Sequence, residues 1–138
     1  MLFYDFEVFK YDWMMVSMDT ESKKYAVCIN NPKALKNFYE LHKNNIWVGY
    51  NSRSYDQYIL KAILLDLDPF KLNQHIILSH EPAWKFSRSF GKYPLYNFDV
   101  MTDITKSLKQ LEGFMGNNIK ETSVAFNIDR RSEEHTSE

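Results

Sequence analysis

Three strand-like stretches in succession at the start of the chain constrain the fold more than any other feature. Over residues 2–9 one face would carry Leu2, Tyr4, Phe6 and Val8. A period of two is that of a β-strand. Residues 13–18 and 24–29 have strand-like composition, and a polar turn at residues 19–22 joins them. Three successive strands with short connections predict an antiparallel meander.

Helix signals follow the three strands. Asn31 and Pro32 suit the N-cap and the first helical position, so a helix is predicted to begin there. Its apolar residues at helical spacing, which we expect to be buried, are Leu35, Phe38 and Leu41.

A short apolar strand is predicted over residues 46–50, with a second helix after it. Ser54 and Gln57 have the spacing of a capping box, with Ser54 as the N-cap, so Asp56 falls in the first helical turn. Asp68 and Pro69 predict another helix that runs through residue 78.

The second half of the chain completes the predicted sheet. Residues 79–94 contain two prolines and a glycine and are predicted to be mostly irregular, residues 95–101 resemble a strand, and a further helix is closed by Gly116 and Asn117. Strands first and strand–helix alternation later indicate an α/β or α+β domain. We predict an α/β fold: a five-stranded mixed sheet with its first three strands antiparallel and with flanking helices.

Composition bounds the possible functions. The 138 residues suffice for one domain, and the formal charge of −1 counts against a large duplex-DNA footprint. The aromatic share of 16% fits a dense core and is also compatible with stacking on unpaired bases. The single cysteine, Cys28, has no partner within the chain, and no signal peptide or membrane span is evident, so a cytoplasmic location is expected.

The acid pair Asp5 and Glu7 is the most informative local feature. Residues two apart in a strand point the same way, so the two carboxylates leave one face with Cα atoms roughly 7 Å apart. Like-charge repulsion and desolvation next to Phe3 and Phe9 disfavour this arrangement, and Mg²⁺ or Mn²⁺ would relieve both penalties. The alternative is an edge strand with a solvated polar face.

A third acid, Asp56, lies at a strand–loop–helix junction, where open sheets often bind ligands. An acid in a first turn is also favoured by the helix dipole alone. In combination, Asp5, Glu7 and Asp56 form a set of carboxylates suited to two metal ions and phosphodiester hydrolysis. Asn51 and Tyr55 are placed to contact terminal nucleotides, and a loop-capping amide and a core ring are their alternative roles.

These residues carry a family resemblance. Asp5-x-Glu7 on the first strand, then Asn51, three residues, Tyr55 and Asp56, resemble the first two motifs of the DnaQ-like (DEDD) exonucleases. The resemblance is closest to the proofreading domain of phage-type DNA polymerases, and it spans roughly residues 2–128. It implies an RNase H-like fold in a phage- or prophage-encoded protein of a bacterial cell.

The resemblance also implies a site, a substrate and a partner. Asp5, Glu7 and Asp56 would be catalytic ligands of two Mg²⁺ or Mn²⁺ ions, and Phe6, Asn51 and Tyr55 would line or support the substrate site. The substrate would be the 3′ end of single-stranded DNA, and a polymerase domain would follow in the same full-length chain.

The chain departs from this pattern at its third motif. That motif should be Tyr-x3-Asp or a His-bearing variant, and no tyrosine after Asp56 has an aspartate four residues further on; Tyr96 and Asp99 are one residue too close. Residues 131–138 resemble a translated sequencing adapter. We therefore expect residues 1–130 to be an exonuclease domain incomplete at its C-terminus, with a non-native tail over residues 131–138. We also expect feeble or no nuclease activity, because three acids hold the second ion poorly.

Two further functions fit the same residues. One is a non-catalytic RNase H-like module that binds nucleic acid without metal. The other is a stand-alone nuclease of the same fold that acts on RNA or on junctions. The least specific alternative is a structural domain whose acids are only surface residues.

Overall fold

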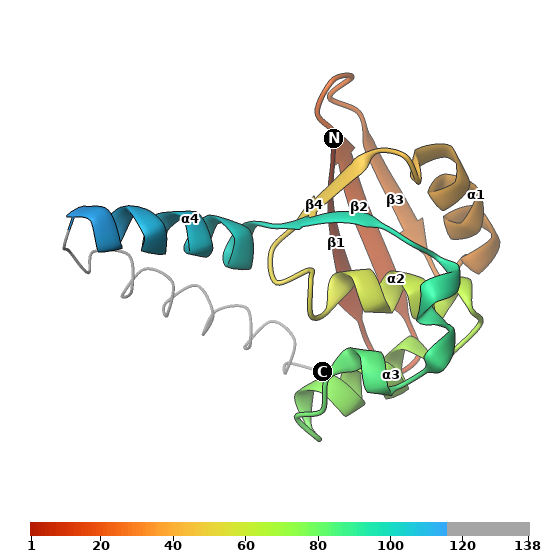
Figure 1. Ribbon diagram of the computed structural model, residues 1–138. Helices are drawn as coiled ribbons and strands as arrows, with labels where there is room; N and C mark the ends of the chain where they lie inside the picture. The colour runs from red at the N-terminus through yellow and green to blue at the C-terminus, as the bar shows by residue number, and fades with distance from the viewer. Residues whose placement is uncertain (116–138) are drawn as a thin grey trace.

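The computed structural model describes residues 1–115 and shows an α/β fold with a five-stranded mixed sheet and flanking helices (Figure 1). The strands are β1 (Leu2–Val8), β2 (Trp13–Asp19), β3 (Tyr25–Ile29), β4 (Ile46–Gly49) and β5 (Tyr96–Asp99). The α-helices are α1 (Pro32–His42), α2 (Asp56–Leu64), α3 (Pro69–Ile77) and α4 (Val100–Met115). Two 3₁₀ turns, η1 (Ala83–Lys85) and η2 (Arg88–Lys92), interrupt the segment predicted to be irregular.

The strand order is β3-β2-β1-β4-β5, so the strand with the acid pair lies in the middle of the sheet. β1 pairs with β2 and β2 with β3 in antiparallel fashion, which confirms the predicted meander. β4 runs parallel to β1, and β5 runs parallel to β4. The predicted five-stranded mixed sheet with three antiparallel strands at its start is therefore confirmed.

One face of the sheet forms the core with α1, α2 and α3. The alternation in β1 predicted this face, because Leu2, Tyr4, Phe6 and Val8 are all buried. At its centre the Trp47 ring, fully buried, packs edge to face on the rings of Tyr4 and Phe38. Burial of a side chain of this size stabilises the fold by roughly 2–3 kcal/mol. The remaining large side chains with almost no exposure are Met15, Leu35, Tyr55, Ile59, Leu60, Leu64 and Leu72.

The helix starts at Asn31 and Asp68 follow the sequence signals. The Asn31 side chain accepts a hydrogen bond from the amide of Ala34, and Asp68 accepts one from Phe70. The predicted burial of Leu41 is wrong, because its side chain is 80% exposed. Tyr39 is buried in its place, since a residue four positions after Leu35 returns to the same helix face and one six positions later does not.

The opposite face of the sheet remains largely exposed within residues 1–115. Asp5 and Glu7 are half-buried on this face. Its apolar side chains include Phe3, Val27, Ile29 and Phe98, each at least 40% exposed. The acid pair therefore lies on an apolar surface, not in the helix-covered core.

Helix α4 leaves the end of β5 and projects away from the sheet (Figure 1). In the part of the chain that the structure describes, no helix combines the length and apolar character needed to cross a membrane. The predicted helix end at residues 116–117 and the predicted tail at residues 131–138 lie outside the described residues.

Candidate functional site

The candidate site lies where β1 and β4 separate. Their parallel pairing covers only Leu2–Trp47 and Phe3–Val48, so the later part of β1 has no β4 partner. The amide of Phe6, which lies beyond this pairing, donates a 3.0 Å hydrogen bond to Oδ1 of Asp56. Asp56 is fully buried, and its place as the first residue of α2 lets the helix dipole stabilise its charge. A buried amide on the part of β1 that β4 does not cover needs an acceptor, and this carboxylate supplies one.

The Asp56 carboxylate thereby lies against the backbone between Asp5 and Glu7. The Phe6 nitrogen is about 2.4 Å from the Cα atom of Asp5 by standard backbone geometry. With the hydrogen bond of 3.0 Å, Oδ1 of Asp56 lies within about 5.5 Å of the Asp5 Cα. Two segments 50 residues apart in the chain are in direct contact at this point.

The donor chemistry of the three acids fits Mg²⁺ or Mn²⁺, since carboxylate oxygens are the ligands these ions prefer. Within residues 1–115, no three acid, histidine or cysteine side chains converge closely enough to hold one ion. Asp5 and Glu7 extend from one face of β1, whereas Asp56 approaches the backbone from α2.

The loop between β4 and α2 is held by Asp99, at the end of β5. Its Oδ1 accepts the amide of Asn51 at 2.9 Å, and its Oδ2 accepts the amide of Arg53 at 2.9 Å. Oδ1 also accepts the amides of Met101 at 2.9 Å and Thr102 at 3.4 Å, so the same carboxylate caps α4. This fully buried side chain fixes the start of α4 and the loop that leads to Asp56.

This arrangement corrects the predicted start of α2. The helix begins at Asp56 with Tyr55 as its N-cap, and no side chain makes the capping bond, so the prediction that Ser54 caps it is wrong. The side-chain amide of Gln57 instead donates to the carbonyl of Arg53 at 2.7 Å. Because the amides of residues 51 and 53 bind Asp99, the chain is still in a turn where the capping box would have started a helix.

Gly49 permits the sharp turn at the end of β4. A Cβ atom at this position would lie 2.7 Å from Cβ and 3.0 Å from Oγ of Ser52, and 3.3 Å from the Tyr4 ring. The turn then passes through Asn51, whose φ of 57° is in the left-handed region that asparagine tolerates. Only a residue without a side chain lets the loop fold back over the strand end this closely.

Tyr4 on β1 bonds to β5 beside the loop. Its hydroxyl donates a 2.6 Å hydrogen bond to Oδ1 of Asn97. Burial raises the pKa of Tyr4 well above its ordinary value, and the nearby carboxylates of Asp56 and Asp99 raise it further against a lowering effect of the Ser52 hydroxyl. The phenol is therefore a neutral donor beside two buried acids at neutral pH.

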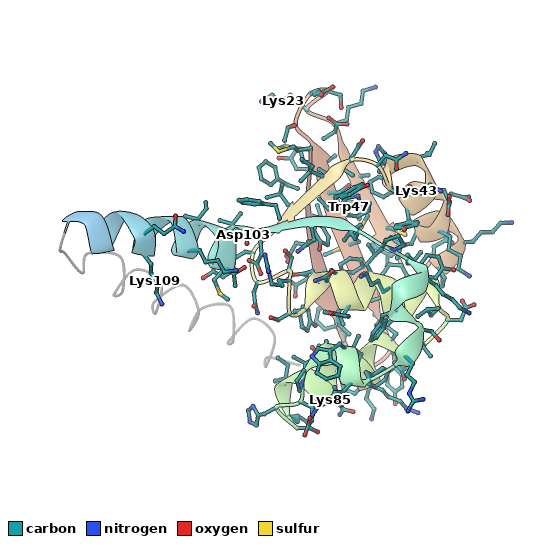
Figure 2. All side chains as sticks on the ribbon, in the orientation of Figure 1. Lys23, Lys43, Trp47, Lys85, Asp103 and Lys109 are labelled. Carbon is teal, nitrogen blue, oxygen red and sulfur yellow. The ribbon has the colours of Figure 1, made fainter. Side chains whose placement is uncertain are left out.

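Arg53 and Asp103 join the loop to α4. A guanidinium nitrogen of Arg53 donates to Oδ1 of Asp103, which lies in the first turn of α4 (Figure 2). Oδ2 of Asp103 accepts the amide of Asp99 at 2.9 Å. The side chain of Arg53 is 48% exposed, so its cation faces solvent on one side.

The three expected substrate residues have different positions. The ring of Phe6 has no exposed surface, and that of Tyr55 is 1% exposed with its hydroxyl bonded to Asn73 at 2.6 Å. Both rings belong to the core and support the backbone of the site from beneath. Asn51 is half-buried in the loop.

The sequence motifs did not identify Asp99 and Arg53 as parts of the site. The signal for Asp99 was present: an acid between a strand and a helix is a typical N-cap. Its two bonds to the loop had no sequence signal, because they join residues 46 and 48 positions apart.

No family model matches the chain, and neither a curated protein nor a solved structure is significantly similar to it.

Proposed function

We propose that the chain carries the first two motifs of a metal-dependent 3′→5′ exonuclease with an RNase H-like fold, of the kind that proofreads for DNA polymerases. The observation that supports this best is the bond between the Asp56 carboxylate and the amide of Phe6, the residue between Asp5 and Glu7. A two-metal site requires both motifs to meet at one place. The central position of β1 and the parallel direction of β4 agree with the proposal.

In this proposal Asp5, Glu7 and Asp56 hold Mg²⁺ or Mn²⁺. The bound ions would supply a hydroxide nucleophile and stabilise charge on the attacked phosphate and the leaving oxygen. Asn51 would contact the single strand from the loop, while Phe6 and Tyr55 fix the positions of the acids from the core. The substrate is the 3′ end of single-stranded DNA, and a polymerase domain of the same full-length chain is the expected partner.

Metal binding tests the proposal directly. We expect Mn²⁺ to raise the unfolding temperature of the chain, because an ion bound only by the folded state stabilises it by about 2.7 kcal/mol at a hundredfold excess over its Kd. Asp5→Asn and Asp56→Asn should abolish most of this increase.

Asp66→Asn is the matched control. The Asp66 side chain is 72% exposed in a surface ion pair with Lys36, and its φ of 62° suits asparagine. The control should keep the full response to Mn²⁺. An equal response in all four proteins would refute the metal site.

Digestion of a 3′-labelled single strand separates the remaining functions. We expect feeble or no Mg²⁺-dependent cleavage by this chain, because three acids hold the second ion poorly. Strong cleavage that survives Asp5→Asn would overturn the assignment of the acids. Strand binding with no response to metal in any assay would identify a non-catalytic nucleic-acid-binding module.

A further inference from the structure

A groove of about 530 Å³ begins next to the candidate site. Arg53 and Ser54, which precede Asp56 by three and two residues, are among the residues that line it. Its other walls come from α2, the end of α3 and the segment around η1, and the residues that argue for a ligand are Tyr58, His80 and Trp84. The volume lies within the usual range for a bound small molecule.

Trp84 is the unusual residue in this groove. Its side chain is 60% exposed, whereas the other two tryptophans, Trp13 and Trp47, are 8% and 0% exposed. An exposed indole costs solvation free energy, and a stacking partner would remove that cost. The ammonium group of Lys85 lies 5.6 Å from the centre of the Trp84 ring and 3.4 Å from the carboxylate of Glu81, which also lines the groove.

The wall that carries Trp84 is fixed in place. Ala83, the preceding residue, is 4% exposed in the core. Nε2 of His75 lies 3.1 Å from the carbonyl oxygen of Pro82, and the amide of Lys85 donates to the same carbonyl at 3.1 Å. The indole is therefore presented on a backbone that needs little ordering when a ligand binds.

Arg53 and Tyr58 line the part of the groove that lies nearest the loop before α2, and Arg53 also pairs with Asp103. The half-exposed guanidinium of Arg53 lies at the end near Asp56, and the Tyr58 ring, with the ammonium of Lys61 at 5.5 Å from its centre, lies on α2. Bases stack on aromatic faces and phosphates bind guanidinium groups, and a nucleic-acid single strand presents both bases and phosphates.

We propose that this groove binds an unpaired nucleotide of a DNA single strand, with its base stacked on Trp84 and its phosphate facing Arg53. The inference rests on the proposed function and specifies where the strand lies relative to the carboxylates. The strand would leave the acids along the start of α2 and pass over η1.

The test measures binding of a short 5′-fluorescein oligothymidylate by anisotropy in EDTA, where no metal contributes. Trp84→Ala should weaken binding by roughly tenfold, the effect of losing one stacked base. Arg53→Gln should weaken it and reduce its dependence on salt. Tyr96→Ala is the matched control, because Tyr96 is 65% exposed at the opposite end of β5 and should leave affinity unchanged.

Intrinsic fluorescence gives a second measurement. Trp84 is the only exposed tryptophan, so oligothymidylate should quench the wild-type emission and leave that of Trp84→Ala unchanged. Equal affinity of Trp84→Ala and wild type, or equal quenching by heparin, would overturn the stacking site.

These outcomes are separable from those of the metal test. No response to Mn²⁺ together with Trp84-dependent binding would refute the exonuclease proposal and support the nucleotide-binding groove. A response to Mn²⁺ together with binding that does not depend on Trp84 would support the exonuclease proposal and refute the groove.

Discussion

Replacement of Asp99 by asparagine tests whether this carboxylate holds the site together. The two carboxylate oxygens accept four amides, from Asn51, Arg53, Met101 and Thr102. Asparagine keeps the shape but presents an NH₂ group to at least one of these donors. One amide is then left without an acceptor, and the other bonds lose the benefit of the charge.

The expected loss of stability in Asp99→Asn follows from those bonds. A buried amide without an acceptor costs about 1–3 kcal/mol, and the weaker neutral bonds add about 1 kcal/mol. We expect Asp99→Asn to lower the free energy of unfolding by about 2–4 kcal/mol, a large share of the 5–15 kcal/mol typical of a domain. The unfolding temperature should fall by on the order of 10 °C.

Urea and thermal unfolding, followed by circular dichroism, measure this change. Asp66→Asn is again the matched control, with an expected loss below about 1 kcal/mol for a surface ion pair. Hydrogen exchange adds a local readout, because the amides of Asn51 and Arg53 should exchange faster in Asp99→Asn by more than the core amides do. The reasoning is refuted if Asp99→Asn is as stable as Asp66→Asn.

Two further predictions concern the same loop. Gly49→Ala should destabilise the chain by about 1–3 kcal/mol in urea unfolding, because its Cβ would lie 2.7 Å from that of Ser52. Gly91→Ala, whose Cβ meets no atom within 4 Å, should change stability by less than about 0.5 kcal/mol, and equal losses would contradict the packing argument. Tyr4→Phe should cost about 1 kcal/mol at neutral pH through the lost bond to Asn97. The pKa of Tyr4 is raised above its ordinary value of 10.0, so its contribution to folding stability is complete below that pH and is lost as the pH rises further. The stability difference between wild type and Tyr4→Phe should therefore become smaller in urea titrations at alkaline pH. A stability difference that stays constant with pH would refute this.

Local sequence patterns determined much of the fold. Period-two alternation predicted β1 and the face it buries, and Asn31 and Asp68 marked two helix starts correctly. These features depend on neighbours within a few residues, where strand geometry and capping bonds act directly. The predicted burial of Leu41 was wrong, because a residue six positions after Leu35 lies off the helix face that packs on the core.

The candidate site, too, was determined partly by the sequence and partly by the tertiary structure. The residues Asp5, Glu7 and Asp56 were identified from their types and spacing, and the sequence also suggested that strand ends would bring them near one another. Only the tertiary structure decided that the Asp56 carboxylate bonds to the Phe6 amide and that Asp99 displaces the start of α2. Both depend on amides left without partners where β4 ends, and the acceptors that satisfy them are nearly 50 residues away, beyond the reach of any local pattern.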